Sequence, residues 1–430
     1  MKKLTGRAIS VVLIIALVLL GTGVYTARLL EKGSDWALYF ARANSGSSGV
    51  LYDRNGEVLA SFSPRGSFYA EDPLTRMACF HIVGDYEGRT GSGLLSTFTN
   101  DIKDYSIFTG TTHSQDYDFS LTLDASICRA AYRSVGADRI GAVLVSNYKT
   151  GEVLCLLSMP TMDPLNPEEE PAEGTYINKC LSAAFVPGSV FMLITSAAAI
   201  ETVSNIWDRQ FFCEGESEIA GVKIACVDPH WTTNFRTALS NSCNIAFANI
   251  AVAVGQDNMK RYVKEYGFTD RHELNGITTA AGNFETAYMG DPELAWAGIG
   301  QWTDLICPFS LLRYVAAIAN DGILMEPYVI EGTGGGSERL IREDTAKTLK
   351  EMMAFNVTDH YGADRFPGLA MCGKSGTAEV GDGTNNSWFT GFLDDPDHPY
   401  AFVVLIEKGG YGLADAGAVA NSVLQAALRD

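Results

Sequence analysis

The sequence predicts an α+β fold in which helices pack on an antiparallel sheet, with a small N-terminal pedestal and one transmembrane helix. Apolar segments 142–146 and 153–157 flank a turn and predict a buried hairpin. Three more strand-like segments follow one another between residues 370 and 406, and their short connections favour antiparallel pairing. Helical stretches lie between these two groups, and another, residues 415–429, closes the chain.

The composition is that of a globular protein. The chain has 430 residues, which is long enough for one large core and a smaller module. Its content of 47% hydrophobic and 19% charged residues excludes a disordered chain. The net charge of −19 disfavours nucleic acid and anionic membrane surfaces as partners.

The amino terminus predicts a membrane anchor, assigned to residues 1–28. Three basic residues among the first seven precede an apolar run, residues 8–27. As a helix this run spans about 30 Å, the thickness of a bilayer core. The basic flank places the amino end in the cytoplasm and the bulk of the chain on the outer side of the cell membrane. A cleaved signal peptide is the alternative, but no pair of small residues closes the run, because Ala27 would pair with Tyr25.

Residues 29–119 predict a short juxtamembrane helix and a small pedestal domain. The Asn55-Gly56 dipeptide between two apolar segments predicts a β-hairpin. A glycine-rich stretch, residues 88–94, lacks the strand–loop–helix context of a phosphate-binding loop and is interpreted as a turn. A boundary near residue 120 then separates the pedestal from a large C-terminal domain, residues 120–430.

A helix predicted at residues 190–200 lies at the centre of the large domain. Almost every residue in it is apolar, so no face of the helix is suited to water. Pro187 and Gly188 end the preceding segment, and Ser189 occupies the N-cap position. The unpaired N–H groups and the dipole at this helix start suit a serine nucleophile whose intermediate is negatively charged, and they suit a capping serine equally.

Two later motifs favour the nucleophile. A helix predicted at residues 238–254 carries Ser242-Cys243-Asn244 near its start, and Lys374-Ser375-Gly376-Thr377 lies in a strand-like segment. The order Pro-Gly-Ser-x-Phe, Ser-x-Asn, Lys-Ser-Gly-Thr resembles the motifs of penicillin-binding proteins and serine β-lactamases. The hairpin segment Leu51-Tyr52-Asp53-Arg54 resembles the class B penicillin-binding proteins. The resemblance covers roughly residues 120–430 and implies the transpeptidase fold of that family.

The resemblance implies D,D-transpeptidase chemistry through an acyl-serine, with no cofactor and no metal. Ser189 matches the nucleophile, and its backbone N–H together with that of Thr377 matches the oxyanion hole. Ser242 matches a proton relay, and Lys374 supplies positive charge for the carboxylate of a D-alanyl stem peptide or a β-lactam. The implied substrate-binding residues are Asn244, Ser375, Gly376 and Thr377.

One position departs from the family pattern. The first motif of the family is Ser-x-x-Lys, in which the lysine takes the proton of the serine, and here Met192 stands in that position. A thioether has no proton-accepting nitrogen, so Ser189 keeps the poor nucleophilicity of an ordinary hydroxyl. In other serine hydrolases the loss of one proton-transfer residue costs about 10⁴ to 10⁶ in rate. Lys374 is an alternative base only if it gives up carboxylate binding, and Lys179 matches no motif position.

Two functional hypotheses follow. The first is a membrane-anchored enzyme that cross-links peptidoglycan stem peptides outside the cell. The second is a non-catalytic homologue that acts as a scaffold or regulator in a cell-wall synthesis complex. The intact second and third motifs favour substrate binding, whereas Met192 favours the second hypothesis for the chemistry. The expected protein partner is a membrane glycosyltransferase or another cell-wall synthesis protein.

The nine cysteines include one pair with a plausible disulfide. Cys213 and Cys226 flank a loop rich in glycine and glutamate, residues 214–218, in a compartment where disulfides persist. We predict a bridge between them, which would add about 3 kcal/mol of stability by closing the loop. A metal site is disfavoured, because only His230 lies nearby and a fourth ligand is not evident.

Overall fold

The structure is a computed structural model, which describes residues 11–27, 49–63, 66–85, 88–97, 105–106, 110–111, 118–285 and 290–429. Contacts divide the chain into two compact units. The first comprises residues 1–49, 62–66 and 98–117, and the second comprises residues 50–61, 67–97 and 118–430.

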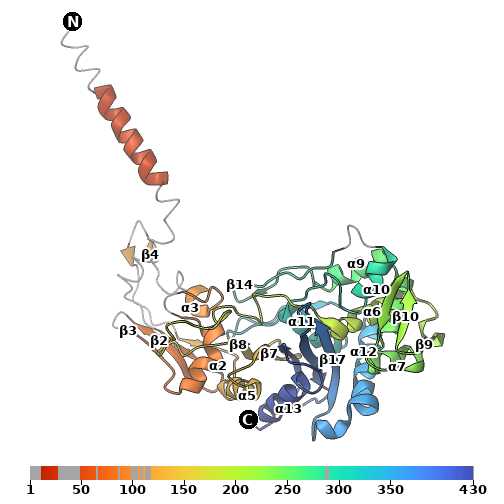
Figure 1. The fold of residues 1–430 in the computed structure, drawn as a ribbon. Coiled ribbons are helices and arrows are strands. Elements are labelled where there is room, and N and C mark those ends of the chain that lie inside the picture. Colours follow the sequence, from red (N-terminus) through yellow and green to blue (C-terminus); the bar gives the residue numbers. More distant parts are fainter. Residues whose placement is uncertain are drawn as a thin grey trace. The chain divides into compact units, whose positions relative to one another are not determined.

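The described part of the first unit contains a helix and a short hairpin. The helix covers residues 11–27 of the apolar run and is drawn in red in Figure 1. The strands β4 (Tyr105–Ser106) and β5 (Gly110–Thr111) pair antiparallel. None of the helices in the described residues has both the length and the apolar character needed to cross a membrane. The basic flank, residues 1–10, and the predicted juxtamembrane segment, residues 28–48, lie outside the described residues.

The second unit begins with the predicted hairpin. Asp53 lies at its turn, where Oδ1 accepts hydrogen bonds from the N–H groups of Asn55 at 2.9 Å and Glu57 at 2.7 Å. The turn confirms the Asn-Gly prediction, because Gly56 adopts φ of +84°. The sheet order is β3-β2-β1-β6, with β1 and β6 parallel. Its strands are β1 (Gly49–Tyr52), β2 (Val58–Ser63), β3 (Gly66–Tyr69) and β6 (Phe119–Ser120).

Helix α2 joins this first sheet to the rest of the second unit. It covers Pro73–Val83, is capped by Asp72, and packs against helix α5 (Ala125–Val135) and strand β8 (Val153–Met159). Arg76 of α2 forms a bidentate ion pair with Asp163, in which both N–O distances are 2.6 Å. The guanidinium lowers the pKa of Asp163 to about 2. Residues 67–97 belong to the same compact unit as residues 118–430, and the domain boundary near residue 120 stays a prediction. The short helix α3 (Leu94–Thr97) follows.

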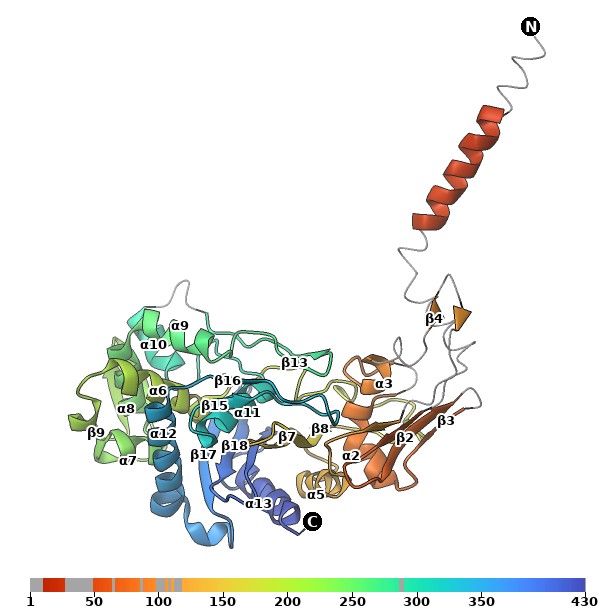
Figure 2. The same ribbon diagram turned by 180° about the vertical axis from the view of Figure 1, so that it is seen from behind.

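A five-stranded antiparallel sheet forms the centre of the second unit, and this confirms the predicted fold class. Its order is β17-β18-β19-β7-β8, so the C-terminal strands pair with the predicted hairpin. Helix α11 covers one face, and α5 and α13, which pack on each other, cover the other (Figures 1 and 2). The elements are β7 (Ile140–Asn147), β8 (Val153–Met159), β17 (Met371–Glu379), β18 (Asn385–Leu393), β19 (Tyr400–Glu407), α5 (Ala125–Val135), α11 (Pro308–Ala319) and α13 (Ala416–Ala427).

The remaining helices gather around α6, which covers Met192–Thr202. Its first eight residues are buried, as the all-apolar pattern predicts, and it packs against α8, α9 and α12. The helices are α7 (Phe235–Ser240), α8 (Asn244–Val254), α9 (Gln256–Glu265), α10 (Asp291–Ala297) and α12 (Glu343–Phe355). Short helical turns are η1 (Gly188–Phe191), η2 (Ile206–Asp208), η3 (Asn356–Tyr361) and η4 (Ala363–Arg365).

Short strands connect these helices in antiparallel pairs. They are β9 (Gln210–Cys213) with β12 (Trp231–Asn234), β10 (Glu216–Ile219) with β11 (Val222–Ala225), β13 (Glu273–Leu274) with β14 (Ile277–Thr278), and β15 (Ile323–Met325) with β16 (Ser337–Arg339). One helix prediction is wrong. The stretch 238–254 is two helices, α7 and α8, because Ser242 adopts φ of +52° and no helix passes through a left-handed residue.

Candidate active site

Ser189 lies in a single turn of 3₁₀-helix, η1, that leads into α6. The N-cap of this turn is Pro187, so Ser189 is not a capping serine. Its side chain is half-buried, and its hydroxyl has no hydrogen-bond partner among the residues that the structure describes. Because the hydroxyl makes no hydrogen bond to the helix start, it does not cap the helix. It is therefore free to contact a ligand.

Strand β17 lies directly against η1, and two glycines make this contact possible. Gly188 adopts φ of +56°, and a Cβ on it would lie 2.9 Å from the carbonyl oxygen of Thr377. A Cβ on Gly376 would lie 3.1 Å from the carbonyl oxygen of Pro187. Larger residues at either position would push the strand away from the turn. The contact therefore places Ser189 beside the Lys-Ser-Gly-Thr segment.

The backbone of β17 offers hydrogen-bonding groups on the side of η1. The strand is the edge of its sheet, so alternate N–H and C=O groups point away from β18. Ser375 is one such residue, since its N–H donates to the hydroxyl of Tyr361 at 3.0 Å. Thr377, two residues on, directs its carbonyl at Gly188. Because the N–H and C=O of one strand residue point to the same side, the Thr377 N–H also faces the turn that carries Ser189.

Lys374 connects the second motif to the third. Its Nζ donates to the Ser242 hydroxyl at 2.5 Å and to the Ser375 carbonyl at 2.7 Å. The side chain is completely buried, and this burial lowers the pKa of the amine to about 7. Ser242 holds a left-handed conformation that costs about 1 to 3 kcal/mol, and it is the residue that turns the chain from α7 to α8.

The other predicted binding residues reach the same region but use their side chains within the protein. Asn244, the first residue of α8, donates from its amide to the carbonyl of Ala225 at 2.8 Å. The Ser375 hydroxyl bonds to the Tyr361 hydroxyl at 3.1 Å. The Thr377 hydroxyl accepts from the N–H of Gly412 at 3.1 Å. These contacts hold the three side chains in fixed positions, and a ligand would have to share or replace them.

Met192 occupies the place below Ser189. It is completely buried, and its N–H donates to the carbonyl of Ser189. Side chains three residues apart eclipse one another in a 3₁₀ turn, so Met192 lies on the same side as the serine. Lys179 is not available as a base, because its amine pairs with Glu407 at 2.8 Å.

Three residues outside the predicted set of site residues support this region. Trp388 donates from its indole N–H to the carbonyl of Val186 at 2.9 Å and so fixes the segment before Ser189. Asn356 donates to the carbonyl of Gly373 at 2.9 Å, which holds η3 against β17. Tyr361 has no motif around it, and only the packing of η3 on the strand reveals its contact with Ser375. Trp388 was recognisable, because it lies in the strand-like segment beside the third motif.

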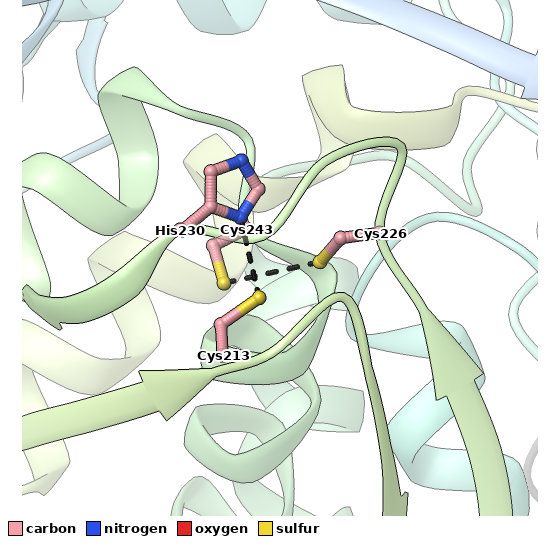
Figure 3. Close-up of side chains that lie close together, drawn as sticks. All are labelled: Cys213, Cys226, His230 and Cys243. Atoms are coloured by element: carbon pink, nitrogen blue, oxygen red, sulfur yellow. Dashed lines mark hydrogen bonds between the residues drawn. The ribbon is translucent and has the colours of Figure 1, made fainter.

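A second cluster lies beside the Ser242 turn. The sulfur atoms of Cys213, Cys226 and Cys243 and a ring nitrogen of His230 all lie within 4.8 Å of one another (Figure 3). The predicted disulfide between Cys213 and Cys226 is not formed, because both cysteines are free thiols. The sequence left a fourth potential metal ligand unidentified. The structure places Cys243, from the middle of the second motif, beside the other three side chains, because the fold brings α8 to the ends of β9 and β11.

Comparisons with known proteins identify the family that the chain resembles. The family model for the penicillin binding protein transpeptidase domain matches residues 141–426. The chain is 26% identical over 334 residues to peptidoglycan D,D-transpeptidase PbpA of Mycolicibacterium smegmatis, covering 67% of each chain. It is 26% identical over 344 residues to stage V sporulation protein D of Bacillus subtilis, covering 73% of this chain and 53% of that protein.

Solved structures share the fold. Penicillin-binding protein A from Mycobacterium tuberculosis, in a ceftriaxone acyl-enzyme complex, superposes with a TM-score of 0.78 at 22% identity, covering 90% of this chain and 99% of that chain. The D,D-transpeptidase domain of a peptidoglycan glycosyltransferase from Eggerthella lenta gives a TM-score of 0.76 at 24% identity, covering 89% of this chain and 99% of that chain.

Proposed function

Because the chain belongs to the penicillin-binding protein transpeptidase family, we propose that it binds D-alanyl peptidoglycan stem peptides and β-lactams where η1, the Ser242 turn and β17 meet. One observation carries the proposal. The Lys374 amine contacts the Ser242 hydroxyl across 132 residues of sequence, on the strand that packs against the turn of Ser189. Three short motifs that are far apart in the chain therefore meet at one place.

The proposed chemistry is acyl transfer through Ser189. Its hydroxyl oxygen attacks the carbonyl carbon between the last two D-alanines, the amide C–N bond breaks, and the terminal D-alanine leaves with a proton. An amine of a second stem peptide then takes the acyl group from the serine. The N–H groups of Ser189 and Thr377 are proposed to hold the oxyanion. Protonated Lys374 attracts the terminal carboxylate, a role that its pKa of about 7 limits to neutral and lower pH.

The rate of this reaction is proposed to be low. The Ser189 proton has no acceptor on its own helix, since the buried side chain at the usual lysine position is Met192. Lys374 acting through Ser242 is the remaining route, because an amine with a pKa of about 7 is partly neutral at neutral pH. A neutral Lys374, however, loses the charge that attracts the carboxylate. One lysine therefore serves two roles that require opposite protonation states.

We also propose that residues 8–27 anchor the protein in the cell membrane as a single pass, with the bulk of the chain on the outer side. The basic residues before the apolar run support this orientation. The partner proposed on this basis is a membrane glycosyltransferase or another cell-wall synthesis protein. Sequencing the amino terminus of the mature protein checks the anchor, and a terminus near residue 28 would contradict it.

Labelling of the full chain with a fluorescent penicillin tests the proposed activity. We expect slow, saturable labelling that disappears in Ser189→Ala and is blocked by unlabelled penicillin. Equilibrium binding of a D-alanyl-D-alanine peptide, followed by isothermal calorimetry, tests recognition without chemistry. If the protein showed neither labelling nor peptide binding, the proposed activity would be contradicted. The scaffold hypothesis would then be favoured, because the protein would lack the substrate recognition of an enzyme.

A further inference from the structure

The cluster of Cys213, Cys226, His230 and Cys243 combines four donor atoms from four different elements. Cys213 ends β9, Cys226 follows β11, His230 precedes β12, and Cys243 caps α8. Figure 3 shows the three sulfurs and one imidazole nitrogen directed toward a common centre. Cys213 and Cys243 are buried, and the other two are half-buried, so the cluster lies just below the surface.

Two of the distances between donor atoms in the cluster match those of a tetrahedral metal site. The Cys226 and Cys243 sulfurs are 3.9 Å apart, and the Cys213 sulfur is 3.4 Å from Nδ1 of His230. Around a tetrahedral zinc ion, ligand bond lengths of about 2.3 Å to sulfur and about 2.0 Å to nitrogen place two sulfurs about 3.8 Å apart and a sulfur about 3.5 Å from a nitrogen. A disulfide requires about 2.05 Å between sulfurs, which the Cys226 and Cys243 pair exceeds.

The backbone holds the donors in place independently of their side chains. The N–H of His230 donates to the carbonyl of Cys213 at 3.1 Å, and the N–H of Cys226 donates to the carbonyl of Gly215 at 2.7 Å. Strands β9 and β12 pair antiparallel with Cys213 opposite Trp231. The sites of three donors are thus fixed by hydrogen bonds between loops and strands, which lowers the entropy cost of binding an ion.

We propose that Cys213, Cys226, His230 and Cys243 bind one zinc ion. Three sulfurs and one imidazole form a soft donor set that selects zinc over magnesium or calcium. Four protein ligands fill a tetrahedral sphere, so the site is structural and leaves no open position for a water or a substrate. Each thiol gives up its proton to solvent as it binds, and the zinc ion takes no part in electron transfer.

The position of Cys243 gives the ion its role. The residue lies between Ser242, which bonds to the Lys374 amine, and Asn244, whose amide bonds to the carbonyl next to Cys226. Zinc bound to Cys226 and Cys243 would reinforce that hydrogen bond and fix the turn between α7 and α8. The ion would therefore hold the left-handed Ser242 in its strained conformation and position it for Lys374.

Metal analysis of the purified full-length protein tests the site without reference to activity. We expect about one zinc ion per chain after dialysis, as for structural four-ligand sites. Replacement by cobalt(II) is expected to give the intense visible absorption of a tetrahedral cobalt–thiolate complex. Cys213→Ser and His230→Gln are expected to lose the bound metal and to lower the melting temperature. Cys307→Ser and His272→Gln, which replace a buried cysteine and a half-buried histidine elsewhere, are the matched controls and should keep it.

Three results would overturn the proposal. The first is wild-type protein that holds neither zinc nor cobalt while its thiols are reduced. The second is a Cys213–Cys226 disulfide found by mass spectrometry of the protein isolated from membranes. The third is metal that remains at full stoichiometry in both ligand variants. If those variants do not fold, the cobalt spectrum of the wild-type protein decides, because only thiolate ligands give its charge-transfer bands.

Discussion

Replacing Met192 by lysine puts an amine one turn below Ser189, where the family has its base. The methionine is completely buried, and lysine has a similar length, so the change neither opens a cavity nor overfills the site. Lys374 shows how strongly burial shifts the pKa of a lysine in this protein, since burial alone lowers its pKa from 10.5 to about 7. A lysine at position 192, which would be equally buried, is expected to have a pKa near this value.

Two magnitudes follow from that pKa. In the unfolded chain the new lysine has a pKa of about 10.4, so the folded variant loses about 4 kcal/mol of stability near pH 7 and only about 2 kcal/mol near pH 9. The sign follows from the lowered pKa, because the unfolded state binds the extra proton until the pH passes its own pKa. The rate of acylation also rises with pH, because only the neutral amine can accept the proton of Ser189. We expect its rate to rise by about 10³-fold or more over wild type above pH 7.

The assay is the second-order rate of labelling by fluorescent penicillin between pH 6 and pH 9, with urea unfolding measured in parallel. Met192→Leu is the matched control, which keeps the apolar volume and should acylate as slowly as the wild type. Two results would refute the reasoning. One is a folded Met192→Lys protein that acylates no faster than wild type at pH 9. The other is rapid, Ser189-dependent acylation of the unmodified protein, which would show that another residue already supplies the base.

Three further predictions concern the residues around the site. Affinity for a D-alanyl peptide should fall as the pH rises from 6 to 8, because Lys374 loses its charge near pH 7, and calorimetry that shows no pH dependence would contradict this. Arg76→Met should lower the free energy of unfolding by about 3 to 5 kcal/mol in urea titrations, because it leaves Asp163 without its partner, and a loss under about 1 kcal/mol would contradict the pairing. Gly188→Ala should cost about 1 to 3 kcal/mol and slow acylation further, because φ is +56° and the new Cβ meets the Thr377 carbonyl, so labelling at the wild-type rate would count against the contact of η1 with β17.

The sequence by itself determined the elements and the motifs. Strands 142–146, 153–157 and those between 370 and 406 were predictable because turn residues and apolar runs act over short distances along the chain. The buried helix α6 was predictable for the same reason, since a helix without a polar face must be internal. The order and spacing of three motifs then pointed to one family before any contact between them was known.

Only the tertiary structure decided how these parts meet. Ser189 proved to lie within a 3₁₀ turn that β17 contacts, and the chain reverses at Ser242 instead of continuing as one helix, because packing against the Lys374 strand overrides local helix propensity. The cysteine cluster also could not be predicted from local sequence. Cys243 belongs to a different motif from Cys213, and nothing in the local sequence reveals that α8 begins where β9 ends. Ligand sets of this kind depend on contacts between distant segments, and hydrophobic burial and backbone pairing decide those contacts only when the chain folds as a whole.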